Sequence, residues 1–167
     1  EELWKGLKKA LDGAIRQFAE TRTLEGENLK RDLLEKLDNM LALVKQIEER
    51  SPKIIAEYKE KLETKVKELL EDAQIEDSRI AAEVVIFADK MCTDEEIVRL
   101  KSHVTHMKET LTADDSGIGR KLDFIAQEMN REANTILSKA NDLEVSNIGI
   151  ELKTEIEKVR EQIQNIE

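Results

Sequence analysis

The polar side chains best suited to chemistry lie between residues 119 and 140, in the stretch GRKLDFIAQEMNREANTILSKA. Steps of three and four residues place its apolar side chains on one helix face: Leu122, Ile125, Met129, Ala133, Ile136 and Ala140. The remaining surface carries amide, hydroxyl and charged groups: Gln127, Glu128, Asn130, Arg131, Glu132, Asn134, Thr135 and Ser138. Because Asn, Thr and Ser are poor helix formers, we expect these side chains to serve a site or a hydrogen-bonded helix or subunit contact.

A second polar stripe precedes this stretch, beside the core positions of another expected helix. It consists of Glu96, Arg99, His103, His106 and Thr110. Thr93 and Glu96 also have the spacing of a capping box, and capping alone would explain Glu96.

The turn-forming segment 113–119, ADDSGIG, joins the two stretches. If the two helices are antiparallel, counting outward from this segment places His103 opposite about Met129, within one turn of Glu128 and Glu132. The same count places Glu96 near Thr135 and Lys139. We therefore expect the two polar faces to meet.

The combined set has the composition of a phosphate-handling site. Carboxylates with one imidazole suit Mg²⁺ or Mn²⁺ better than zinc, so the candidate metal ligands are Glu96, His103, Glu128 and Glu132. Arg99, Arg131 and Lys139 are candidates for holding phosphate oxygens. Gln127, Asn130, Asn134 and Thr135 are candidates for hydrogen bonds to the sugar and base edges of single-stranded RNA.

The composition indicates which elements position these residues. Of 167 residues, 38% are charged, 3% are aromatic and one is proline, which predicts an all-α fold of long helices. A net charge of −10 argues against a self-sufficient nucleic-acid binder, but allows a local basic patch or basic surface on another domain. The lone Cys92 excludes an internal disulfide and favours the cytoplasm. We expect no membrane span and no signal peptide. Since the chain starts at Glu1, we expect a fragment.

Residues 1–76 are expected to form a long antiparallel helical hairpin, and residues 77–167 a helical bundle that carries the site. Ser51 and Pro52 should end the first helix, because proline disfavours helical geometry in the preceding residue. A polar break, Arg22-Thr-Leu-Glu25-Gly26, interrupts the apolar stripe of the first helix. It fits either close helix packing around an internal Arg–Glu pair or a site that reaches into the helix.

Three strings in the sequence resemble the YicC/YloC-like family of bacterial proteins. They are EEIVRLKSH at 95–103, the stretch 119–140, and REQIQNIE at 160–167; the early Arg22-x-x-Glu25-Gly26 adds to them. The resemblance covers essentially the whole chain. It implies cytoplasmic, metal-dependent endoribonucleases that act as homo-oligomers, with a hexamer expected, and that carry an N-terminal domain absent from this chain. Where many relatives have Asp after Lys-Ala, this sequence has Cys92.

The resemblance also implies an RNA-handling site that contains Glu96, Arg99, His103, Gln127, Glu128, Arg131, Glu132, Asn134 and Lys139. Our first hypothesis is an endoribonuclease that cleaves single-stranded RNA, with His103, Glu128, Arg131 and Glu132 as catalytic residues and a divalent Mn²⁺ or Mg²⁺ ion held by the Glu/His set. The alternative is a non-catalytic RNA-binding or oligomerising scaffold, in which the polar faces are subunit interfaces.

Overall fold

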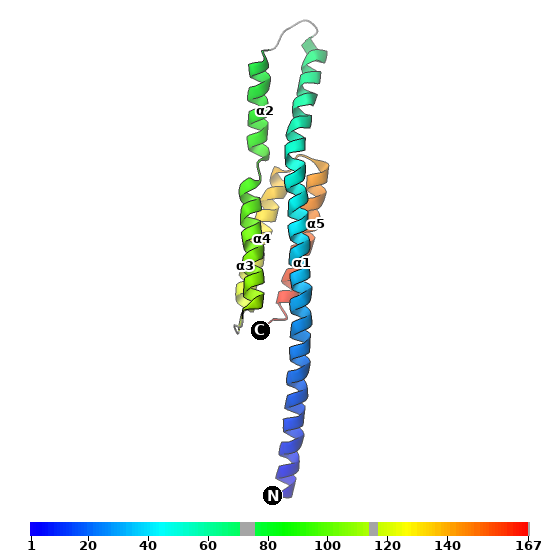
Figure 1. Ribbon diagram of the computed structural model, residues 1–167, viewed down its shortest axis with the longest axis vertical. Helices are drawn as coiled ribbons and strands as arrows, with labels where there is room; N and C mark the ends of the chain where they lie inside the picture. The colour runs from blue at the N-terminus through cyan, green and yellow to red at the C-terminus, as the bar shows by residue number, and fades with distance from the viewer. Residues whose placement is uncertain (71–75, 114–116, 167) are drawn as a thin grey trace.

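The computed structural model describes residues 1–70, 76–113 and 117–166. Within these ranges the chain forms five α-helices, which are α1 (Glu2–Leu70), α2 (Asp77–Met91), α3 (Asp94–Thr112), α4 (Gly119–Lys139) and α5 (Leu143–Ile163). The predicted all-α fold is therefore confirmed. Figure 1 shows an elongated molecule in which α3, α4 and α5 pack beside the middle of α1.

The predicted end of the first helix at Pro52 is wrong, because α1 continues through this residue for 69 residues in all. Proline removes one backbone hydrogen bond and usually kinks a helix. Here Arg50 donates to Glu57 at 2.8 Å, spanning the proline, and to Asp142, the N-cap residue of α5, at 2.7 Å. Ser51 Oγ donates to the carbonyl oxygen of Ile47 at 2.8 Å. These contacts hold the helix on both sides of Pro52.

The hairpin predicted within residues 1–76 is not formed, because α1 is continuous from Glu2 to Leu70. A two-helix hairpin is formed instead by the C-terminal part of α1 and by α2 (Figure 1). The rings of Tyr58 and Phe87 stack between the two helices with centroids 3.7 Å apart. No residue of α2 is fully buried. The hairpin is thus a thin two-helix extension of the bundle, and residues 71–75 between its helices lie outside the described residues.

The bundle core is formed by one cluster of buried side chains from α1, α3, α4 and α5. Helix α1 contributes Leu33, Leu37, Met40, Val44 and Ile47, at the three- and four-residue steps of a buried stripe. Leu122, Met129 and Ile136 of α4 are fully buried, as the sequence predicted. Because α1 supplies part of this core, it belongs to the bundle as well as to the hairpin.

The N-terminal part of α1, residues 2–28, projects beyond the bundle and is called the arm here (Figure 1). Every residue of the arm is exposed. The polar break lies in it, with the Arg22 guanidinium 5.7 Å from the centre of the Phe18 ring and no atom within 4 Å of a Cβ built on Gly26. The close packing considered for Gly26 is therefore not observed. No helix among the described residues has the length and apolarity to cross a membrane.

Candidate functional site

Two ion pairs set the register between the antiparallel helices α3 and α4. Lys139 Nζ lies 2.9 Å and 3.0 Å from the two carboxylate oxygens of Glu96, and Arg99 Nε lies 3.5 Å from Glu132 Oε1. The expected proximity of Glu96 and Lys139 is confirmed. One helical turn further along, the same register places His103 level with Glu128.

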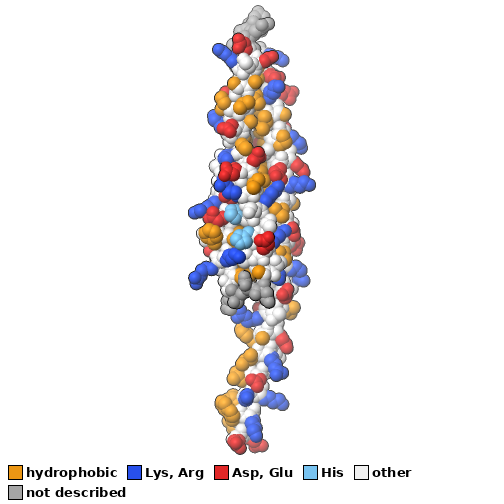
Figure 2. Space-filling model, turned by 60° about the vertical axis from the view of Figure 1, so that its left-hand side comes forward, with side chains coloured by type: hydrophobic (Ala, Val, Ile, Leu, Met, Phe, Trp, Pro, Cys, Tyr) orange, Lys and Arg blue, Asp and Glu red, His pale blue; other side chains and the backbone are white. Residues whose placement is uncertain are grey.

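We call this line of residues the α3–α4 seam, and define it as Glu96, Arg99, His103, Glu128, Glu132, Thr135 and Lys139. His103 is half-buried, whereas His106, one turn further along α3, is exposed. Figure 2 shows both histidines close together on one face of the bundle, with Lys, Arg, Asp and Glu side chains around them. The seam therefore presents an imidazole and charges of both signs to solvent.

The Glu96–Lys139 pair is the buried end of the seam. Glu96 is only 4% exposed. Burial raises the pKa of this carboxyl, but hydrogen bonds from Lys139 and from its own backbone, with the nearby charges of Lys139 and Arg99, outweigh burial and lower the pKa overall. The expected capping box is not formed, because Thr93 is the N-cap residue without a side-chain hydrogen bond and Glu96 is bound to Lys139.

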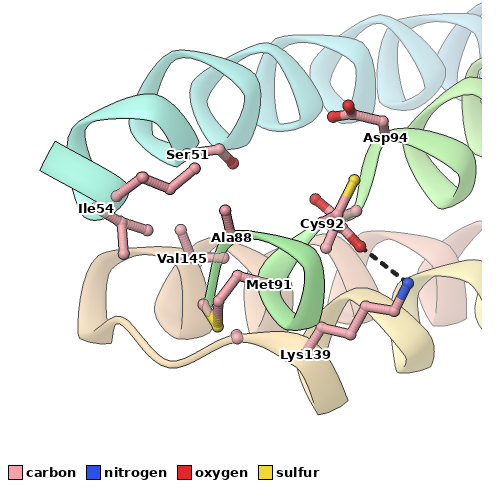
Figure 3. Close-up of a pocket in the computed structure, with 11 residues that line it drawn as sticks. Ser51, Ile54, Ala88, Met91, Cys92, Asp94, Lys139 and Val145 are labelled. Atoms are coloured by element: carbon pink, nitrogen blue, oxygen red, sulfur yellow. Dashed lines mark hydrogen bonds between the residues drawn. The ribbon is translucent and has the colours of Figure 1, made fainter. Parts of the chain in front are cut away.

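Lys139 also closes the junction between α2 and α3. Its ammonium group donates to the carbonyl oxygen of Cys92 at 2.9 Å, as Figure 3 shows. Beside this contact lies a mostly apolar cavity of about 230 Å³, whose lining includes Ile54, Met91 and Val145. The Cys92 side chain is exposed and free. Lys139 thus has a structural role at this junction in addition to its place in the seam.

The outer part of the seam consists of charges that are paired within the seam or with adjoining residues such as Arg131. Arg131 lies 2.9 Å from Glu128 on its own helix, and Arg99 contacts both Glu95 at 3.0 Å and Glu132. The carboxylates of Glu128 and Glu132 are largely covered, whereas the Arg131 side chain is 76% exposed. An exposed guanidinium held by a covered carboxylate is suited to binding a phosphate, since arginine binds phosphate oxygens in bidentate fashion.

The remaining predicted RNA-binding residues do not all lie in the seam. Asn130 Nδ2 donates to Glu157 of α5 at 3.3 Å, and Gln127 Nε2 donates to Asp123 at 2.8 Å. Asn134 is exposed near them, because a step of four residues keeps it close to Asn130 on the helix surface. The polar surface of α4 is thus divided between an edge that meets α3 and a part that faces α5 and solvent.

The proposed metal ligands do not form a centre in this structure. Among the described residues no group of three or more His, Cys, Asp or Glu side chains is arranged to hold a metal ion. Instead, Glu96, Glu128 and Glu132 are each paired with a cation of the chain. The residues present do not fit a preformed Mg²⁺ or Mn²⁺ site.

Reasoning from the sequence missed the cluster around Arg50. This arginine binds Glu57, Asp142 and Glu144, with Nε 3.1 Å from Glu144. Asp142 also accepts the backbone N–H of Val145 at 3.0 Å and thereby caps α5. Its Arg50 hydrogen bond lowers the pKa of Asp142. An Asp just before an apolar helix is a typical N-cap signal that could have identified Asp142, but nothing in the sequence links it to Arg50.

Residues 47–167 match the family described as "Endoribonuclease YicC-like, C-terminal". The chain belongs to this YicC-like family. It is 46% identical over 166 residues to a probable endoribonuclease YicC of Clostridioides difficile (strain 630), covering 99% of this chain and 56% of that protein. It is 35% identical over 165 residues to the probable endoribonuclease YicC of Haemophilus influenzae (strain ATCC 51907 / DSM 11121 / KW20 / Rd), covering 96% and 55%.

These similarities confirm the YicC-like resemblance of the sequence. The chain spans just over half the length of the two relatives. The family match begins at residue 47, so it includes the whole seam and leaves the arm outside. The seam is therefore part of the YicC-like C-terminal region.

Proposed function

We propose that this YicC-like chain is the RNA-handling part of an endoribonuclease that cleaves single-stranded RNA, and that the α3–α4 seam is the surface at which the scissile phosphate is held. The observation that carries the proposal is the shared register of the Glu96–Lys139 and Arg99–Glu132 pairs. It aligns a half-buried imidazole with carboxylates and guanidinium groups on one exposed face. The names of the relatives supply the reaction class.

In this proposal each type of side chain has one task. Arg99 and Arg131 bind the phosphate oxygens and offset the charge that develops on them during cleavage. His103 transfers the proton, taking it from the attacking hydroxyl or giving it to the departing oxygen. Glu128 and Glu132 hold the two guanidinium groups in position until RNA arrives. Gln127 and Asn134 lie further out, where they would contact sugar and base edges.

A requirement for Mn²⁺ or Mg²⁺ is a separate part of the proposal, since these carboxylates are already paired with arginine. An ion bound by Glu128, Glu132 and His103 would have to displace Arg131 and Arg99. We therefore expect metal binding by this chain to be weak and to strengthen when Arg131 is replaced by alanine. Titration calorimetry with Mn²⁺ measures this, and tight binding by the unaltered chain would contradict it.

The test of the site uses two glutamates with nearly the same setting. Glu128 pairs with Arg131 at 2.9 Å and is 23% exposed, while Glu155 of α5 pairs with Lys158 at 2.6 Å and is 17% exposed. Cleavage of a labelled single-stranded RNA should fall at least about 100-fold in Glu128→Gln and less than about twofold in Glu155→Gln. His103→Gln should match Glu128→Gln. The assay should be run on this chain and on a full-length relative that carries the equivalent substitutions.

The alternative is a non-catalytic RNA-binding or oligomerising scaffold, and the internal pairing of the seam charges favours it. If Glu128→Gln and Arg131→Ala change the oligomeric state measured by light scattering, the seam is a subunit interface. If all variants bind RNA and neither this chain nor the full-length relative cleaves it, the catalytic proposal fails. We also propose that the protein forms a homo-oligomer.

A further inference from the structure

The arm carries an apolar face that no other described residue of the chain covers. Its large side chains are Leu3, Trp4, Leu7, Leu11, Ile15 and Phe18, and each is between 56% and 89% exposed. At 100° per residue these positions fall within about 120° of the helix circumference, which is the width typical of a helix packed on a globular domain. Figure 2 shows the apolar side chains gathered along one side of the projecting helix.

This face continues the side by which α1 packs on the bundle. Helical spacing places Leu7, Leu11 and Phe18 on nearly the same side as the buried Met40 and Ile47. The C-terminus lies at one end of the bundle, and the arm extends past that end (Figure 1). An occupant of the arm would therefore sit beyond this end of the bundle, on the same side of α1.

The comparisons indicate what that occupant is. The match to the C-terminal family begins only at residue 47, yet the similarity to the Clostridioides difficile protein covers 99% of this chain. The arm is therefore shared with the relative but lies outside the C-terminal family region. Only 56% of that relative is matched, so a large part of it has no counterpart in this chain.

We propose that the apolar face of the arm is the docking surface for a folded domain found in the part of YicC-like proteins that this chain does not span. The continuous helix α1 then connects that domain directly to the bundle. The polar side of the arm, which carries Lys5, Lys9, Asp12 and Arg16, lies opposite this face. The docked surface should accordingly be apolar.

Hydrogen–deuterium exchange of this chain and of the full-length Clostridioides difficile relative tests the proposal. Backbone amides of residues 3–18 should exchange rapidly here, because a helix end without tertiary contacts frays. The aligned segment of the relative should be protected at least about 100-fold more. The readout does not depend on RNA cleavage, so it is independent of the proposed function.

Two paired substitutions give a matched control. In the relative, the two residues aligned with Leu7 and Leu11 are replaced by Gln, and this change should remove the protection. The same change at the two residues aligned with Lys5 and Lys9, on the other side of the helix, should preserve the protection. Equal exchange of the arm in both proteins would overturn the proposal. The proposal would also be overturned if this chain self-associates and the Leu7→Gln/Leu11→Gln variant does not, since the apolar face would then hold a second copy of the chain.

Discussion

At the scale of single residues, the Glu96–Lys139 pair matters most, because it joins α3 to α4 with a nearly buried carboxylate. Removing one partner of such a pair leaves a buried charge without compensation. We expect Lys139→Met to lower the free energy of unfolding by about 2 kcal/mol. Lys101→Met is the control, since Lys101 pairs with Glu48 where both side chains are 40% exposed, and it should cost less than about 1 kcal/mol. Urea unfolding measures both, and equal losses would contradict the argument.

The same pair predicts how stability depends on pH. The pKa of Glu96 is lowered in the folded chain, so the folded state binds fewer protons there than the unfolded state. The contribution is complete above the ordinary carboxyl pKa of about 4.5 and is lost as the pH falls through the lower folded pKa. Without Lys139, burial shifts the pKa of Glu96 upward, so the stability difference between the unaltered chain and Lys139→Met should be largest near pH 7 and shrink on acidification. A difference that grows on acidification would contradict this assignment.

At the scale of elements, the course of α1 through Pro52 shows tertiary contacts overriding a local signal. Helix α1 retains the proline although it removes the N–H that would bond to the carbonyl of Glu48. Pro52→Ala should therefore raise the free energy of unfolding by about 1–3 kcal/mol. Ser51→Ala, which removes only a side-chain bond to Ile47, should change it by less than about 0.5 kcal/mol. Destabilisation by Pro52→Ala in urea unfolding would indicate that the proline sets a required bend.

Helix α4 shows what periodicity determines and what it leaves open. Spacing correctly separated Leu122, Met129 and Ile136 from the polar residues. It grouped Asn130 with Glu128 because both are polar, but Asn130 bonds to α5 whereas Glu128 lies at the edge that meets α3. The arrangement of neighbouring helices, not the repeat within α4, decides which polar residues share a site.

At the scale of the whole molecule, the bundle should be independent of the arm. No residue from 1 to 28 is buried, and the described core begins at Leu33. Deleting residues 1–28 should therefore shift the thermal midpoint by less than about 3 °C, while the helical signal in circular dichroism falls in proportion to length. A larger decrease in the thermal midpoint would show that the arm stabilises the bundle in solution.

The sequence by itself determined the all-α class, the buried faces, the antiparallel meeting of Glu96 with Lys139 and the YicC-like resemblance. These follow from local spacing, from a short connection between two helices, or from long matching strings. The tertiary structure decided that α1 passes through Pro52, that Arg50 joins α1 to the start of α5, and that the apolar face of the arm stays exposed among the described residues. Each of these depends on residues far apart in the sequence, whose proximity no local pattern encodes.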